Sequence, residues 1–198
     1  MGRAVGVRRG RGRPVTVFAS GQGAEIADTE ALAAGVHGTR LFFEYDKVAP
    51  WAATDLAPPQ RRPRREADRD ADELLAVADH YGASRAVGIS RGARAVIGVL
   101  AEEPDRFERV ALVLPPGGNA AGRYAPWLAA RLADPIPPRP VEAELLVIGQ
   151  RGDRVHPARL AEQWAQLLAA RLEVFPTGGI FVRHAEWYHA LLAEFMNA

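Results

Sequence analysis

The sequence predicts a doubly wound α/β domain, in which helices cover both faces of a mostly parallel sheet. Short runs rich in apolar and β-branched residues alternate with longer segments of helical periodicity, as in βαβ units. The strand candidates are nearly continuous apolar runs, which indicates parallel strands buried on both faces. These candidates are residues 15–19, 39–43, 85–89, 110–114, 144–148 and 172–175.

The helix candidates lie between these strands and carry apolar residues three and four positions apart. The helix expected at 92–102 shows this spacing with Ala93, Val96, Ile97 and Leu100. Further helices are expected at 72–81, 157–171 and 186–197, and the second of these begins with Pro157, a residue suited to a first helical turn. No repeat or boundary interrupts the pattern, so we expect one domain spanning residues 1–198.

The composition fits a globular protein with a substantial core. The chain has 198 residues, of which 48% are hydrophobic, and a formal net charge of +1, which excludes disorder as its dominant state. It has no cysteine, so disulfide scaffolds, thiolate metal sites and cysteine nucleophiles are excluded, and a cytoplasmic location is expected. No apolar run approaches the roughly 20 residues that a membrane span needs.

The basic residues are nearly all arginine, and several of them cluster at the amino terminus. Only Lys47 among the 25 basic residues is a lysine, a bias typical of GC-rich bacterial genomes. Residues 1–13 hold arginines but no acidic residue, and we expect them to form a loose basic arm before the first strand. Nucleic-acid binding is not expected, because the arm lacks interleaved aromatic residues and the net charge is near zero.

A serine motif stands between a predicted strand and a predicted helix. Residues 88–92 read G-I-S-R-G and fit the pattern G-x-S-x-G, in which a tight strand-to-helix turn aims the serine hydroxyl out of the sheet. The helix that begins behind the serine favours negative charge that develops there. The alternative interpretation is a glycine-rich connection in which Ser90 only caps the helix.

With this motif, the chain resembles the α/β-hydrolase superfamily over nearly its whole length. Residues 18–23 (F-A-S-G-Q-G) stand where the family carries His-Gly-x-Gly, residues 152–157 (G-D-R-V-H-P) resemble its acid loop, and residues 176–184 lead to a histidine before the last helix. The resemblance implies that nucleophile, acid and base follow in the family's chain order. They would be Ser90, Asp153 and His184.

The acid and the base each have a simpler interpretation. Asp153 could instead satisfy free backbone N–H groups near a helix start, and His184 could be a surface or capping histidine. Many members of the family place the histidine directly after the glycine, where this chain has Ile180. His156 is expected to cap a helix or line the rim of the site, and His189 falls within the last helix. These two histidines are the next candidates for the base if His184 does not fill that role.

Several further residues are candidates around the nucleophile. The resemblance implies an oxyanion hole formed by the backbone N–H groups of Arg91 and Gln22. By the same resemblance, residues 115–140 are expected to form a reduced lid region in place of the family's helical cap. The substrate-binding candidates are Ser20, Tyr45, Trp127 and His156. Ser20 stands where the family has histidine, and we expect its hydroxyl to stabilise the loop.

These features together predict a serine hydrolase that acts on an ester, thioester or lactone through an acyl-enzyme, on a small-molecule or carrier-bound acyl substrate. No cofactor is expected, and no metal, because the close pair Asp153 and His156 has no third ligand at a useful spacing. The reduced lid leaves a homodimer as an alternative to a monomer. Two other functions stay open: a non-hydrolytic catalyst of a cyclisation, elimination or isomerisation of a natural-product intermediate, and a pseudo-enzyme that binds a partner.

Overall fold

The structure is a computed structural model that describes residues 6–21, 23–43, 66–116 and 141–198. Its strands are β1 (Gly6–Arg9), β2 (Val15–Ala19), β3 (Thr39–Phe43), β4 (Arg85–Ile89), β5 (Arg109–Val113), β6 (Glu144–Gln150) and β7 (Arg171–Phe175). Its helices are α1 (Ile26–Ala31), α3 (Glu66–Tyr81), α4 (Arg91–Glu102), α6 (Ala158–Leu168) and α7 (Ala185–Asn197), with a π-helical turn η1 (Gly179–Arg183) before α7.

The strands form one sheet in the order β1-β3-β2-β4-β5-β6-β7. Every neighbouring pair is parallel except β1 and β3, which are antiparallel. The chain therefore adds strands outward from β2 in both directions. The carboxyl ends of the parallel strands share one edge, where α/β folds place their chemistry.

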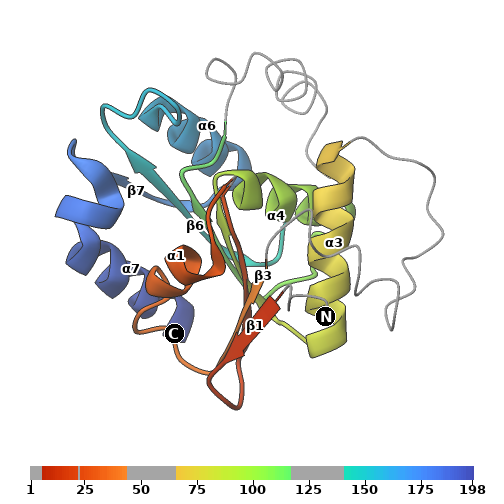
Figure 1. Ribbon diagram of the computed structural model, residues 1–198. Coiled ribbons are helices and arrows are strands. Elements are labelled where there is room, and N and C mark those ends of the chain that lie inside the picture. Colours follow the sequence, from red (N-terminus) through yellow and green to blue (C-terminus); the bar gives the residue numbers. More distant parts are fainter. Residues whose placement is uncertain (1–5, 22, 44–65, 117–140) are drawn as a thin grey trace.

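Helices cover both faces of this sheet and divide the core in two (Figure 1). On one face, α3, α4 and α6 bury side chains such as Leu74, Val96 and Trp164 against the strands. On the other face, α7 buries Tyr188 and Leu192, and the segment after α1 contributes Val36. The doubly wound α/β fold is thereby confirmed, and its six predicted strands lie within one or two residues of the positions expected.

The amino-terminal segment differs from the prediction. Residues 6–9 were expected to belong to a loose basic arm, and this was wrong, because they pair with β3 as strand β1 from Gly6 opposite Phe43 to Arg9 opposite Arg40. Nε of Arg9 also donates to the carboxylate of Glu30 at 2.6 Å. The strand forms because β3 would otherwise leave an edge of unpaired backbone groups.

Helix α6 ends earlier than the apolar spacing suggested. Ala169 adopts a left-handed conformation with φ of 52°, and its N–H returns to the carbonyl groups of Ala165 and Gln166. This geometry is a common way to end a helix. The chain can then start β7 at Arg171.

Within the described ranges, no helix combines the length and the apolar character that crossing a membrane would require.

Candidate active site

Ser90 lies at the sharp turn between the end of β4 and the start of α4. Its backbone has φ of 51° and ψ of −109°, a conformation that is rare and strained for any residue other than glycine. The N–H of Ser90 donates to the carbonyl of Val113 at 2.9 Å, and its own carbonyl accepts from the N–H of Arg94 at 3.2 Å. The turn is therefore held from β5 on one side and from the first turn of α4 on the other.

The two glycines of the motif are required by close backbone packing. A Cβ atom added to Gly92 would lie 1.9 Å from the carbonyl oxygen of Ala19, and one added to Gly88 would lie 2.6 Å from the Cα of Ala93. Neither distance is compatible with a side chain, because the opposing atoms belong to backbone. The glycines let α4 start directly against β2 and β4, which places Ser90 at the carboxyl edge of the sheet.

A histidine contacts the nucleophile, and it is His156. Its Nε2 lies 2.8 Å from Oγ of Ser90. On the other side of the ring, Nδ1 lies 3.6 Å from Oδ2 of Asp153, an ion-pair distance that is longer than a hydrogen bond. Ser90, His156 and Asp153 thus lie in the order in which a nucleophile, a base and an orienting acid act.

The acid loop folds so that one carboxylate orders the residues that follow it. Oδ1 of Asp153 accepts the N–H of Val155 at 2.7 Å and the N–H of His156 at 2.8 Å. Such a local turn is typical of aspartate. It sets the backbone of His156 while Oδ2 of the same carboxylate faces the imidazole.

The electrostatics of the site favour a neutral imidazole. Burial lowers the pKa of His156 below its ordinary value, and the carboxylate of Asp153 opposes this shift without reversing it. A neutral histidine at neutral pH can accept a proton, as a general base must. Because Asp153 attracts a proton on Nδ1, it favours the tautomer whose Nε2 lone pair faces Ser90.

The loop that carries Asp153 is fastened to the neighbouring connection between β7 and α7. The N–H of Arg151 donates to the carbonyl of Phe175 at 2.9 Å. Oε1 of the buried side chain of Gln150 accepts the N–H of Ile180 at 2.7 Å, and Gly152 packs so closely on Thr177 that a Cβ would lie 2.7 Å from Cγ2. These contacts hold the acid loop in place from outside the site.

The structure does not bring His184 to the nucleophile. Its Nε2 lies 3.3 Å from the carbonyl oxygen of Thr177, and its ring lies against Phe175 and Trp187. Among the described residues, no hydrogen bond joins it to Ser90 or Asp153. The reason is η1, a wide turn that buries Ile180 in the core at 1% exposure and carries His184 to the start of α7. The expected pairing of Ser90 with His184 is therefore replaced by the pairing with His156.

The remaining predicted residues have mixed outcomes. Ser20 is buried, and its hydroxyl donates to the carbonyl of Phe43 at 3.3 Å, which is the loop-stabilising contact expected of it. Gly21 follows it beside the nucleophile, since its Cβ would lie 3.6 Å from that of Ser90. Three candidates fall outside the described residues, as does the lid region beyond residue 116. They are Gln22, Tyr45 and Trp127.

The sequence did not predict the contact of His156 with Ser90, nor the roles of two supporting residues, Gln150 and Asp70. A signal for His156 was present, because Asp153 and His156 stand three residues apart in the loop after a strand. The sequence alone placed His156 at the rim of the site, as a substrate-binding candidate, and assigned the base to His184. Nothing in the local sequence marked Gln150 or Asp70, whose partners lie 21 to 30 residues away.

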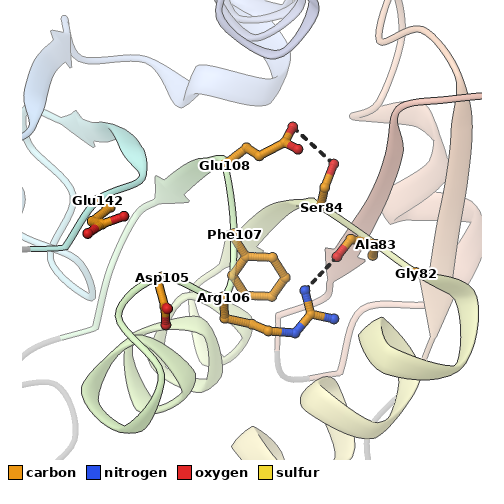
Figure 2. Close-up of a pocket in the computed structure, with 8 residues that line it drawn as sticks. All are labelled: Gly82, Ala83, Ser84, Asp105, Arg106, Phe107, Glu108 and Glu142. Atoms are coloured by element: carbon orange, nitrogen blue, oxygen red, sulfur yellow. Dashed lines mark hydrogen bonds between the residues drawn. The ribbon is translucent and has the colours of Figure 1, made fainter.

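A separate cavity of about 470 Å³ lies at the opposite edge of the sheet (Figure 2). It is lined by Gly82, Ala83, Ser84, Asp105, Arg106, Phe107, Glu108 and Glu142. Some of its polar side chains bond within the cavity wall: Ser84 donates to Glu108 at 3.2 Å, and Arg106 donates to the carbonyl of Ala83 at 2.8 Å. It holds neither the strained serine nor a histidine. The groups suited to catalysis lie instead at Ser90.

No group of three or more potential metal-ligating side chains is arranged for a metal ion among the residues that the structure describes. His156 and Asp153 therefore lie together without a third ligand from those residues. Their arrangement fits proton transfer at Ser90, where a neutral histidine needs one partner on each ring nitrogen.

No protein-family model matches the sequence, and no curated protein matches it. Solved structures do match. A meta-cleavage product hydrolase from Pseudomonas fluorescens IP01 aligns with a TM-score of 0.68 at 16% identity, over 97% of this chain and 93% of its own. Est816, described as an N-acyl homoserine lactone degrading enzyme, aligns with a TM-score of 0.69 at 14% identity, over 96% and 95% of the two chains. MGS-MChE2, an alpha/beta hydrolase enzyme from the metagenome of sediments of the Mar Chica lagoon in Morocco, aligns with a TM-score of 0.67 at 18% identity, over 97% and 94%. At these identities the likeness shows the fold.

Proposed function

We propose that this chain, which has the α/β-hydrolase fold, is a serine hydrolase that cleaves an ester, thioester or lactone. The observation that carries the proposal is the 2.8 Å contact between Oγ of Ser90 and Nε2 of His156, made at a strained strand-to-helix turn. A serine is a weak nucleophile alone and is activated by an adjacent base within hydrogen-bond reach. Here the base is neutral and the acid Asp153 lies behind it.

In the proposed first step, Ser90 gives its proton to His156 as Oγ attacks the carbonyl carbon of the substrate. The carbonyl oxygen becomes an oxyanion, and the backbone N–H of Arg91, together with that of Gln22, would donate hydrogen bonds to it. The imidazolium that forms is stabilised by the carboxylate of Asp153. The amino-terminal end of α4 adds a favourable dipole for the developing charge.

In the second step, the tetrahedral intermediate collapses and the bond to the leaving oxygen or sulfur breaks. His156 returns its proton to the leaving group, and the acyl group stays on Ser90. A water molecule then gives a proton to His156 as it attacks the acyl carbon, and collapse of this intermediate releases the acid and restores Ser90. One base serves both halves of the reaction.

The proposed substrates share a carbonyl carbon that Ser90 would attack. Two of the similar structures belong to proteins described as a hydrolase and as a lactone-degrading enzyme, and a lactone is a cyclic ester that the same chemistry opens. A small-molecule or carrier-bound acyl compound is consistent with this site. Amides are less suitable, because they demand stronger protonation of the leaving group.

The proposal is tested by covalent labelling with a fluorophosphonate probe, read by intact mass and peptide mapping. The variants are Ser90→Ala, His156→Ala and, as a matched control, His184→Ala. We expect stoichiometric labelling of the wild type at Ser90, no labelling of Ser90→Ala, and labelling slowed at least about 100-fold in His156→Ala. His184→Ala should label at a rate close to that of the wild type.

Each contrary outcome points to a different conclusion. Slow labelling of His184→Ala with fast labelling of His156→Ala would assign the base to His184. A folded wild type that is not labelled would refute the serine mechanism. Turnover of an ester or lactone panel that survives Ser90→Ala would show that Ser90 is not the nucleophile. Absence of such turnover in the wild type would favour the non-hydrolytic alternative, in which His156 or Asp153 acts as acid or base.

A further inference from the structure

A buried carboxylate on α3 binds two arginines of the helix that begins at the nucleophile. Nε and Nη2 of Arg91 donate to Oδ2 and Oδ1 of Asp70 at 2.8 Å and 2.7 Å, and Nη2 of Arg94 donates to Oδ2 at 2.7 Å. Asp70 is 2% exposed and Arg94 is 4% exposed. Helices α3 and α4 lie side by side on one face of the sheet (Figure 1), so this group of charges joins them next to the elbow.

The cost of burying such charges suggests a purpose other than stability. Removing charged groups from water is unfavourable, and a well-packed apolar cluster is often as stable as a buried ion pair or more so. The ion pair instead fixes the position and orientation of the arginine side chain. Arg91 meets Asp70 through two parallel hydrogen bonds, and this planar arrangement fixes the direction of the guanidinium as well as its distance.

The two arginines that Asp70 binds are also the residues that shape the turn. Arg91 follows Ser90 directly, so its backbone N–H is the donor expected to face the oxyanion. The N–H of Arg94 donates to the carbonyl of Ser90 at 3.2 Å and closes the first turn of α4. Asp70 therefore binds the side chains of Arg91 and Arg94, and the backbone of these two residues forms part of the strained turn.

We propose that Asp70 is a positioning residue for catalysis, which clamps Arg91 and Arg94 and thereby holds the backbone N–H of Arg91 toward the developing oxyanion. The inference rests on the proposed function. Oxyanion donors act because they are held in place before the charge appears, so a small shift of this N–H would reduce the rate. Asp70 itself does not touch the reacting atoms.

A second aspartate on α3 provides a matched control. Asp79 also pairs with an arginine, since its Oδ1 accepts from Nε and Nη2 of Arg106 at 3.1 Å and 2.8 Å. Its side chain is 63% exposed. Arg106 precedes β5 at the amino edge of the sheet, beside Ala83 (Figure 2), whereas Ser90 follows β4 at the carboxyl edge. Loss of this pair should leave the elbow unchanged.

The test compares Asp70→Asn, Arg91→Met and Asp79→Asn with the wild type. The rate constant for fluorophosphonate labelling of Ser90 is measured across pH, together with thermal unfolding. We expect the plateau rate to fall about 10- to 100-fold in Asp70→Asn and Arg91→Met. The pH midpoint should stay where His156 sets it, and Asp79→Asn should stay within about 2-fold of the wild type.

Arg91→Met keeps the test decisive if Asp70→Asn does not fold, because the pair between Asp70 and Arg94 remains. A folded Arg91→Met that labels within about 2-fold of the wild type would overturn the inference, as would a lowered melting temperature with an unchanged rate. If the variants match a wild type that is labelled, only the positioning role fails. If the wild type is not labelled at Ser90, the proposed function fails and the inference fails with it.

Discussion

The close packing of Gly92 allows the geometry of the elbow to be tested by a single methyl group. A Cβ at this position would lie 1.9 Å from the carbonyl oxygen of Ala19. The two must separate by about 1.5 Å before they reach an ordinary contact of about 3.4 Å. The oxygen belongs to the backbone and the Cβ is attached directly to it, so neither can rotate away, and Gly92→Ala must move the start of α4 away from β2, and Arg91 with it.

Two effects of known size follow from that displacement. Misplacement of a reacting group by about 1 Å costs on the order of 100-fold in rate, so labelling of Ser90 in Gly92→Ala should fall by at least about 100-fold. Overpacking of this kind also destabilises a fold by about 1–3 kcal/mol. Urea unfolding should show this loss, and circular dichroism should show that the variant still folds.

Gly98 of the same helix is the control for the added methyl group. Its Cβ would lie 2.9 Å from the Cβ of Ala71, so a shift of about 0.5 Å restores ordinary contact. The higher helix propensity of alanine, worth up to about 1 kcal/mol, offsets part of the strain. Gly98→Ala should label like the wild type. A folded Gly92→Ala that labels within about 3-fold of the wild type would refute the claim that the close approach positions the nucleophile.

Three further predictions concern the acid loop. Labelling of Ser90 should rise with pH as His156 loses its proton, with a midpoint below the ordinary value of 6.5 because burial lowers that pKa; a midpoint above 6.5 would contradict this environment. Asp153→Asn should move the midpoint lower still, because the carboxylate raises the pKa of His156. It should also reduce the plateau rate of labelling roughly 10²- to 10⁴-fold through loss of the productive tautomer, and an unchanged plateau would exclude an orienting role. Gln150→Leu should destabilise the fold by about 1–3 kcal/mol in urea unfolding, because the buried N–H of Ile180 loses its acceptor; unchanged stability would mean that another acceptor replaces it.

The lowered pKa of His156 also predicts how the stability of the fold depends on pH. Its pKa is lower in the folded protein than the ordinary value that an unfolded chain has. Its contribution to stability is therefore fully present above pH 6.5 and is lost as the pH falls through the folded-state pKa. Replacement by glutamine should flatten this part of the stability profile.

The sequence alone determined the features that depend on nearby residues. The strands at 15–19, 39–43 and 85–89 were predicted at the bounds that the structure has, because a continuous apolar run is stable only when both of its faces are covered. The elbow at Ser90 was predictable as well, since its glycines and serine act through contacts within a strand-to-helix turn. The order of these signals along the chain was enough to predict the α/β class and the fold that it resembles.

Only the tertiary structure decided which groups meet across the fold. Residues 6–9 became a strand because the edge of β3 was available to pair with them. His184 is placed away from Ser90 because η1 turns Ile180 into the core, and His156 is placed beside Ser90 because Asp153 orders the loop that carries it. The link from Asp70 to the elbow likewise exists only where α3 packs on α4. Periodicity indicates which face of a helix or strand is buried. Which histidine reaches Ser90, in contrast, depends on shifts of a few ångströms in the loop conformations, and local sequence does not determine these.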